Sequence, residues 1–238
     1  MRGLLDAVYP PVCHICGRLS RGPYPHCCGH CFQSFEFIGV HCCELCGELF
    51  YSRQVPHLCL SCIKRRPPFA WCRGALIYRG AVAEALSALK YQGMISMQKP
   101  LEEALARGIR TMRPLPETDV LVPVPLSHRG LWKRGFNQSY ILSASLARQL
   151  DLAVETDVLR RKGYRTQVGL AARDRDRNAA ASFVPGRSVH RIKGQRVLLF
   201  DDVYTTGATV RACARILRRA GAQVSVLTLA RARAGRGG

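Results

Sequence analysis

The sequence predicts an α/β protein: a small cysteine-rich module, then a parallel sheet with helices on both faces. Two observations predict this division. Eleven of the 12 cysteines lie within residues 1–72, whereas residues 73–238 alternate apolar runs of strand length with segments of helical periodicity. Such alternation is typical of a parallel sheet covered by helices. We therefore expect two parts, residues 1–72 and residues 73–238.

Eight cysteines of the first part form four pairs, each with two residues between its members. The pairs are Cys13 and Cys16, Cys28 and Cys31, Cys43 and Cys46, and Cys59 and Cys62. Two thiolates at this spacing reach one tetrahedral Zn²⁺ from a single turn. Gly17 and Gly47 follow the first pair of each half and allow the positive φ that such a turn often needs. Four pairs predict two structural zinc sites of a zinc-ribbon kind.

Other uses of these cysteines carry less weight. Disulfides are disfavoured because we expect no export signal, and thiols of the cytosol stay reduced. A redox motif would not repeat four times. Pairing within each half is simplest, but interleaved pairing stays open, and Cys27 or Cys42 could supply a three-residue spacing instead. We expect Cys72 and Cys213 to be small buried apolar residues.

The chain is strongly basic, with 36 Lys and Arg against 16 Asp and Glu, a formal charge of +20. Residues 73–238 carry +17 of this charge. A surplus of this size favours phosphate-bearing partners, either nucleic acid or phosphorylated small molecules; the alternative is a solvated basic surface. Apolar runs such as residues 197–200 are far shorter than the ~20 residues of a membrane span. The N-terminus reaches Asp6 without an apolar core, so we expect a cytoplasmic protein with no membrane insertion.

The strands and helices of the second part follow from their apolar patterns. In residues 81–91 the apolar positions Val82, Ala85, Leu86 and Leu89 recur at helical spacing. Short runs rich in Val and Leu predict buried strands. We expect strands at 75–78, 119–124, 154–159, 197–200 and 223–229, and helices at 81–91, 101–112, 137–150 and 208–220.

A candidate ligand site follows the strand expected at residues 197–200. Asp201 and Asp202 come first, and carboxylates there can accept hydrogen bonds from sugar hydroxyls. A loop then enters the next helix, where backbone N–H groups and hydroxyls bind phosphate. Its residues are Tyr204, Thr205, Thr206, Gly207, Ala208 and Thr209. The alternative is a plain strand–loop–helix whose Asp pair caps the helix.

This segment resembles the phosphoribosyl pyrophosphate (PRPP) motif of type I phosphoribosyltransferases. Nearly the whole chain is similar to the ComF family. The segments that carry this likeness are Pro123-Val124-Pro125, Arg134-Gly135-Phe136-Asn137-Gln138, Leu89-Lys90-Tyr91-Gln92-Gly93 and the cysteine pairs. The resemblance implies the type I phosphoribosyltransferase fold and a bacterial protein linked to competence, the handling of incoming single-stranded DNA. Many relatives carry an acid where this chain has Met94, so no role of that acid is transferred.

The resemblance also implies contacts to PRPP. The loop at residues 126–138 would meet pyrophosphate through Arg129, Lys133 and Arg134. Lys90 and Arg173 are further candidate contacts, although Lys90 could equally be a surface lysine whose stem lies along a helix. Mg²⁺ would bridge oxygens of pyrophosphate and ribose, and Asp201 and Asp202 would fix the ribose.

The acceptor of a phosphoribosyl transfer is not evident, because no base-selecting element follows the last expected strand. Two classes therefore stay open. One is a transferase with an unknown acceptor. The other is a non-catalytic competence factor that senses PRPP or binds single-stranded DNA, with DNA-uptake proteins as partners. Binding of single strands needs aromatic stacking platforms, and the candidates are Trp132, Phe136, Tyr164 and Tyr204.

Overall fold

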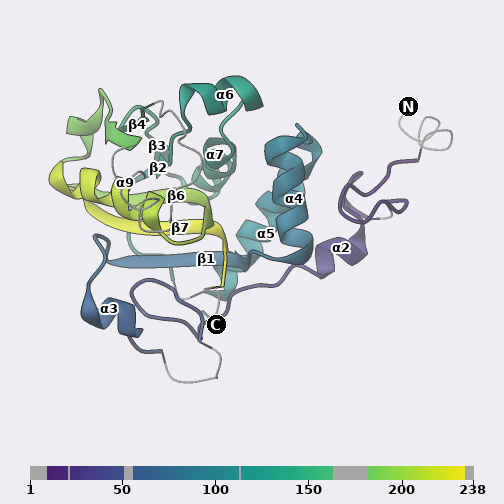
Figure 1. Ribbon diagram of the computed structural model, residues 1–238, viewed down its shortest axis with the longest axis horizontal. Helices are drawn as coiled ribbons and strands as arrows, with labels where there is room; N and C mark the ends of the chain where they lie inside the picture. The colour runs from purple at the N-terminus through teal and green to yellow at the C-terminus, as the bar shows by residue number, and fades with distance from the viewer. Residues whose placement is uncertain (1–9, 21, 51–55, 113, 163–181, 234–238) are drawn as a thin grey trace, which may run out of the picture.

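A five-stranded parallel sheet lies at the centre of the chain (Figure 1). The computed structural model describes residues 10–20, 22–50, 56–112, 114–162 and 182–233. The strand order is β1-β7-β6-β2-β3. Their bounds are β1 Trp71–Ile77, β2 Val120–Pro123, β3 Ala153–Val154, β6 Arg196–Tyr204 and β7 Gln223–Arg231. The predicted α/β class with a parallel sheet is confirmed.

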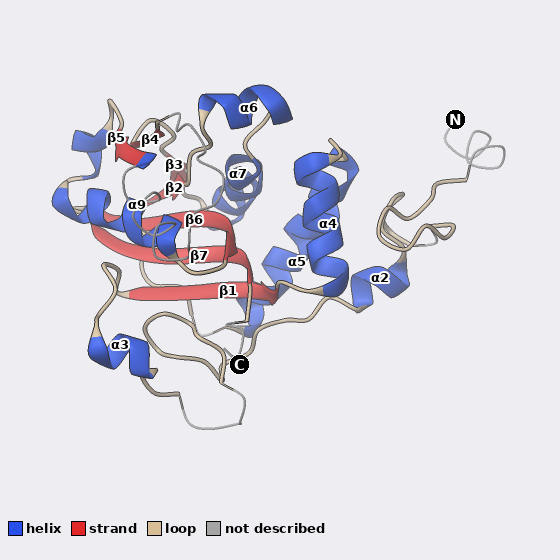
Figure 2. Cartoon of the chain, in the orientation of Figure 1, coloured by secondary structure: helices blue, strands red, loops and turns tan. Residues whose placement is uncertain are grey.

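Helices cover both faces of this sheet (Figure 2). Alternate residues of the central strand β6 divide between two cores. Leu198 and Phe200 join α4, α5 and α7, whereas Val197 and Leu199 join α9. The bounds are α4 Gly80–Tyr91, α5 Gln98–Thr111, α7 Gln138–Leu150 and α9 Ala208–Arg219, with short 3₁₀ helices η1 Ile95–Met97 and η2 Val189–Ile192. No helix within the described ranges is long and apolar enough to cross a membrane.

The cysteine-rich part forms two similar ribbons that pack into the cores of opposite faces. The first ribbon (residues 10–20 and 22–33) ends with α2 Gly29–Gln33, which lies near α4 and α5 in Figure 1. Its Phe32 joins the core that contains those two helices. The second ribbon (residues 41–50 and 56–64) ends with α3 Leu60–Lys64, and it packs with α9. Cys72 and Cys213 are fully buried in that same core, as expected.

A connector between the ribbons runs along the outer edge of β1. The N–H of Ile38 donates to the Ala75 carbonyl at 3.0 Å, and the N–H of Ile77 donates to the Glu36 carbonyl at 2.8 Å. The bridge between these two bonds is antiparallel. Edge strand β1 therefore has a hydrogen-bonded neighbour on each side, since β7 pairs with it on the other.

The single strand expected at residues 154–159 is wrong. Ala153–Val154 (β3) pairs with β2 at the edge of the main sheet. Leu159–Arg161 (β4) instead pairs antiparallel with Phe183–Pro185 (β5) in a separate two-stranded sheet. Because a strand exists only with its partner, and β5 lies more than 20 residues downstream, the local pattern could not divide this segment.

Two further differences concern the segments around the candidate site. Strand β6 continues beyond Phe200 to Tyr204, because β7 stays paired beside it; this outweighs the weak strand propensity of Asp. The loop expected after β2 contains a short helix, α6 His128–Arg134. Its apolar residues Leu131 and Trp132 are exposed, so neither supplies the buried apolar position that a periodicity search detects.

Candidate functional site

The candidate ligand site lies where β6 extends past its neighbour β2. The last residue pair between these strands joins Pro123 and Phe200, and Asp201 and Asp202 follow at once. On the other side, β7 stays paired with β6 as far as Tyr204. The two carboxylates therefore lie at the carboxyl end of the parallel sheet, where α/β proteins bind ligands.

The two carboxylates have different partners. Ser139 Oγ donates to Asp201 Oδ1 at 3.3 Å, and the backbone N–H of Asp202 donates to the same oxygen at 2.9 Å. Lys90 Nζ lies 2.8 Å from Asp202 Oδ1, and this ion pair is largely shielded from solvent. The fold thus brings the sequence-predicted Lys90 to the predicted carboxylate pair.

Asp201 is costly to ionise in the folded chain. Burial, followed by the neighbouring charge of Asp202, raises the pKa of Asp201 from 3.8 to about 7, although the Asp202 N–H and the Lys90 charge act in the opposite direction. Between these two pH values the folded chain keeps a proton that the unfolded chain has released. Stability therefore falls as pH rises through that window. A carboxylate retained at such a cost is typical of a functional site.

Replacing Asp201 by asparagine is therefore expected to stabilise the ligand-free protein. The amide oxygen can still accept from Ser139 and Asp202, and the side chain cannot ionise. The gain in unfolding free energy should be about 2 kcal/mol larger at pH 8.5 than at pH 5. Urea denaturation of wild type and Asp201→Asn at both pH values measures it. A difference independent of pH would contradict the buried, proton-retaining carboxyl.

A capped turn places Ser139 against Asp201. Gly135 ends α6 in the left-handed conformation, with φ +77°. The Asn137 side chain then caps α7: its Oδ1 accepts from the Ser139 N–H at 3.1 Å, and its Nδ2 donates to the Val124 carbonyl at 3.1 Å. These bonds tie the first turn of α7 to the end of β2, which explains the Gly-Phe-Asn-Gln run that the sequence singled out.

Arg134 connects three helices beside this turn. Its Nη1 donates to Gln138 Oε1 at 3.1 Å, and its guanidinium carbon lies 4.9 Å from the centre of the Tyr91 ring. Gln138 is fully buried, and its Nε2 has no partner among the described atoms. The contact of Arg134 with pyrophosphate stays a prediction. Three other predicted cations lie outside the described part: the side chains of Arg129 and Lys133, and the whole of Arg173.

The loop between β6 and α9 rests on the Tyr204 ring. Gly207 precedes α9 with φ +76°, and a Cβ built on it would lie 2.2 Å from Tyr204 Oη. Tyr204 is buried, so its ring packs against the inner side of the loop at Gly207. Thr205 and Thr206 are exposed, and Thr206 Oγ1 accepts from the Ala208 N–H at 3.3 Å. Thr205 and Thr206 therefore present exposed side chains just before α9, at a helix start that favours an anion.

Three residues in contact with predicted site residues were missed by sequence reasoning. Ser139 could have been found as the residue that an Asn cap presents at the start of a helix. Arg211 follows Gly207 by one helical turn and donates to Tyr204 Oη at 3.5 Å. Arg231 stacks its guanidinium carbon 4.0 Å from the Tyr204 ring centre. The register of β7 on β6 places Arg231 opposite Tyr204, and no local sequence signal indicates this pairing.

Each half of the cysteine-rich part brings its own four cysteines together. In each group the four Sγ atoms lie within 4.8 Å of one another. The groups are Cys13, Cys16, Cys28 and Cys31 (first cluster), and Cys43, Cys46, Cys59 and Cys62 (second cluster). The structure therefore groups the cysteines within each half, as the simplest pairing predicts, and neither group takes cysteines from both halves. Cys27 and Cys42 are buried and belong to neither cluster.

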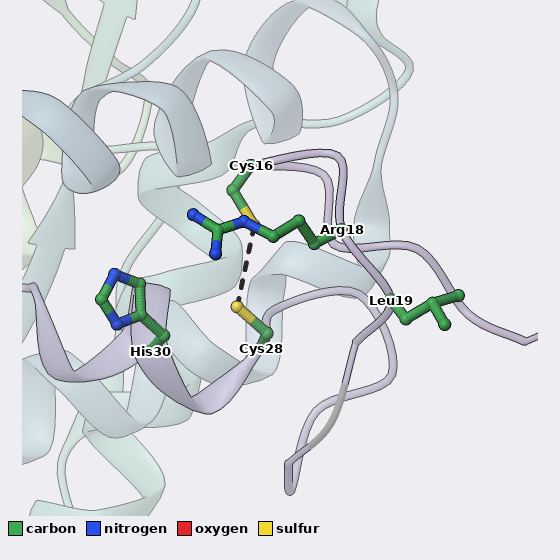
Figure 3. A pocket seen from close by; sticks show the side chains of 5 residues that line it. All are labelled: Cys16, Arg18, Leu19, Cys28 and His30. Atoms are coloured by element: carbon green, nitrogen blue, oxygen red, sulfur yellow. Dashed lines mark hydrogen bonds between the residues drawn. The ribbon is translucent and has the colours of Figure 1, made fainter.

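The geometry of both clusters suits a tetrahedral zinc ion. Sulfurs bound at about 2.3 Å to tetrahedral zinc lie roughly 3.8 Å apart. The Sγ atoms of Cys16 and Cys28 are 3.8 Å apart (Figure 3), and those of Cys46 and Cys59 are 3.6 Å apart. Backbone N–H groups also point at the sulfurs, with distances of 3.4 Å to Cys13 Sγ and 3.3 Å to Cys43 Sγ. Both clusters are consistent with zinc ribbons.

A hollow opens beside the first cluster (Figure 3). Cys16 and Cys28 line it together with Arg18, Leu19 and His30. Four thiolates and one Zn²⁺ leave a net charge of −2, and the Arg18 cation offsets part of it.

The second ribbon packs closely on β1, and two glycines show the contrast. Gly17 and Gly47 occupy equivalent positions, both with φ +71°. A Cβ at Gly47 would lie 2.5 Å from the Cys72 carbonyl oxygen, whereas a Cβ at Gly17 would meet nothing within 4 Å. The turn of the second cluster therefore needs glycine both for its φ and for its close approach to β1.

Gly47→Ala is expected to destabilise the zinc-loaded protein more than Gly17→Ala does. The left-handed conformation costs either alanine about 1–2 kcal/mol. The clash with β1 adds about 1–3 kcal/mol at position 47 alone. Urea denaturation of the two variants measures the difference, and equal losses would contradict the close docking of the second ribbon.

Two family models match the chain. One describes a double zinc ribbon domain and matches residues 4–63. The other describes a phosphoribosyl transferase domain and matches residues 137–237. The first model covers both cysteine clusters, and the second covers β6, the loop that follows it and α9.

Curated relatives match nearly the full length of the chain. Competence protein F of Haemophilus influenzae is 32% identical, over 97% of this chain and 95% of its own. A DNA utilization protein of Escherichia coli is also 32% identical, over 90% of this chain and 93% of its own. Competence protein ComFC of Bacillus subtilis is 29% identical, over 86% and 83%.

Proposed function

Because the chain belongs to the ComF family of competence proteins, with a double zinc ribbon and a phosphoribosyltransferase domain, we propose that it binds PRPP with Mg²⁺ at the carboxyl end of β6. One observation carries this proposal. Two adjacent carboxylates, one buried and one paired with Lys90, stand near the end of β6, two residues before the loop that enters α9. A sugar that carries phosphate needs this combination of acceptors and donors.

The ligand's chemical groups are assigned to parts of the site by their hydrogen-bonding needs. Ribose hydroxyls donate to Asp201 and Asp202, which Ser139 and Lys90 hold in place. The 5′-phosphate accepts from loop N–H groups and hydroxyls at the start of α9. Pyrophosphate is directed toward Arg134. The carboxylates of Asp201 and Asp202 offer oxygen atoms of the kind that Mg²⁺ prefers, and Mg²⁺ that enters with PRPP would neutralise part of the leaving-group charge.

A transfer reaction at this site would break the bond between the anomeric carbon and pyrophosphate and form one from that carbon to an acceptor. The ribose gains positive charge as the bond breaks. The carboxylates of Asp201 and Asp202 stabilise that charge because they are already oriented. The chain's own contribution is thus positioning and electrostatic stabilisation.

The relatives' names support a role in DNA uptake or use. They are called competence proteins or DNA utilization proteins. We assign this chain to the handling of incoming single-stranded DNA, with DNA-uptake proteins as partners.

Titration calorimetry with PRPP and Mg²⁺ tests the proposed site. Wild type should saturate, and Asp201→Asn/Asp202→Asn should bind at least about 100-fold more weakly, since two charge-assisted acceptors are lost. Asp151→Asn is the matched control: Asp151 is exposed, and its φ of +53° is one that asparagine adopts readily. Its affinity should equal that of wild type.

Absence of saturation by wild type at millimolar PRPP would overturn the proposal. Single-strand binding would then be the leading function. Of the predicted platforms, Trp132 is 94% exposed, whereas Tyr204 is buried and Tyr164 lies outside the described residues. Tyr91, which was not predicted, is 68% exposed, and Arg134 stacks on it. Aromatics beside cations are the elements of a stacking platform for bases. Oligothymidylate binding through them should weaken steeply with salt.

A further inference from the structure

A buried arginine connects the second ribbon to the candidate PRPP loop. Arg231 ends β7 and is 2% exposed. The sheet register places it opposite Tyr204, whose carbonyl accepts from the Ala232 N–H at 2.9 Å. Arg231 therefore sits at the point where β6 leaves the sheet and enters the loop.

The guanidinium of Arg231 contacts the ribbon and the loop at once. Its Nη1 donates to the Cys46 carbonyl at 2.8 Å, and its Nη2 pairs with the Glu48 carboxylate. Its carbon lies 4.0 Å from the Tyr204 ring centre. Its Nε has no partner among the described atoms. A buried cation with an unpaired N–H lowers the stability of the fold. If Arg231 served packing alone, an apolar residue would give a more stable protein.

Tyr204 transmits the position of Arg231 to the loop. The space beside Gly207 is filled by the Tyr204 ring, as the 2.2 Å approach of a Cβ to its hydroxyl shows. The same hydroxyl accepts from Arg211 on α9. Because these groups are in contact, the ring cannot tilt without displacing Gly207 and the first turn of α9.

A second buried arginine provides a comparison within the same chain. Arg73, on β1, is 4% exposed. Its Nη1 donates to the carbonyls of Cys43 and Glu44, each at 3.0 Å, and to Cys72 at 2.8 Å. Arg73 thus anchors the same ribbon through equally buried bonds, but these bonds lead to β1 and not to the loop.

We propose that Arg231 is a positioning residue that couples the second ribbon to the PRPP loop. Arg231 binds Cys46 and Glu48 of the ribbon and also fixes the Tyr204 ring. Through these contacts the second ribbon helps to hold the ligand loop in position. The inference deepens the proposed function and rests on it for the ligand's identity. The effect of Arg231 on the loop does not depend on the ligand, so the stability of the loop can be measured in the ligand-free protein.

Hydrogen exchange of the zinc-loaded full chain tests the coupling. Arg231→Lys keeps the charge but loses the planar stack, and it has one donor nitrogen where Arg231 uses two, on Cys46 and Glu48. Amides of residues 205–209 should then exchange about tenfold faster, because local opening becomes easier. Arg73→Lys is the matched control: it should weaken the hold on the ribbon but leave exchange at 205–209 as in wild type. Equal exchange at 205–209 in the two variants would overturn the inference.

PRPP binding gives the second measurement. If wild type binds PRPP, Arg231→Lys should bind about tenfold more weakly, which is a typical coupling between sites, and Arg73→Lys should bind as wild type does. Failure of wild type to bind would refute the proposed function, while the exchange result still decides the coupling.

A second variant covers the case in which Arg231→Lys does not fold. Glu48→Ala removes one partner of Arg231 at a position with 30% side-chain exposure. It should raise loop exchange about fivefold, at the lower end of the same coupling range; unchanged exchange would overturn the inference.

Discussion

Gly207→Ala is expected to weaken PRPP binding by about 100-fold, or about 2.8 kcal/mol. Two costs act at this position. Its φ of +76° costs alanine about 1–2 kcal/mol. The new methyl would also lie 2.2 Å from Tyr204 Oη and 2.8 Å from Arg211 Nη1. Since Tyr204 is buried, the loop moves and no longer presents its N–H groups to phosphate.

Gly194→Ala separates the clash from the backbone strain. Gly194 has φ +79°, and a Cβ there would meet nothing within 4 Å. This variant should lose about 1–2 kcal/mol of unfolding free energy and keep the PRPP affinity of wild type. Calorimetric titration of both variants measures the affinities. An affinity of Gly207→Ala within threefold of wild type would show that the loop does not need glycine for the ligand.

Loss of the second cluster is expected to cost the fold more than loss of the first. Cys31→Ser and Cys62→Ser remove equivalent ligands, since Cys31 lies on α2 and Cys62 on α3, and both are buried. Each variant should bind one zinc instead of two. Cys62→Ser should lose about 3 kcal/mol more unfolding free energy than Cys31→Ser. The reason is that Arg73 and Arg231 would stay buried and charged but would no longer have the carbonyl groups of the second ribbon as hydrogen-bond acceptors.

Metal analysis together with urea denaturation checks this expectation. Two zinc ions per chain in wild type and one in each variant would establish equal loss of metal. Stability then reports what each ribbon contributes to the rest of the fold. A larger loss in Cys31→Ser than in Cys62→Ser would mean that the two buried arginines do not depend on the second ribbon.

The features predicted well from the sequence are those whose chemistry lies within a few residues. The two cysteines of each pair are close enough to meet on one turn, so spacing alone indicated their clusters. Asp201, Asp202 and the loop that follows are likewise one continuous segment. Their place at the carboxyl end of the sheet followed from the alternation of strands and helices.

The features that escaped prediction depend on pairing between distant segments. Lys90 itself was a predicted site residue, but its ion pair with Asp202 was not, because 112 positions separate the two residues and they meet only where α4 and β6 share a core. The stack of Arg231 on Tyr204 follows from the register of β7 on β6. The end of β6 escaped for the same reason, since β7 extends the strand through two Asp residues that local propensity disfavours.

The connector along β1 has a consequence for the order in which the chain folds during synthesis. Strand β1 leaves the ribosome about 150 residues before β7, its partner in the sheet, and an unpaired strand invites aggregation. The connector at residues 36–38 is made earlier still and pairs antiparallel with the outer edge of β1. One edge can therefore be closed as soon as the strand emerges. In this state the nascent β1 exposes only one unpaired edge to other chains, the edge that β7 will later occupy.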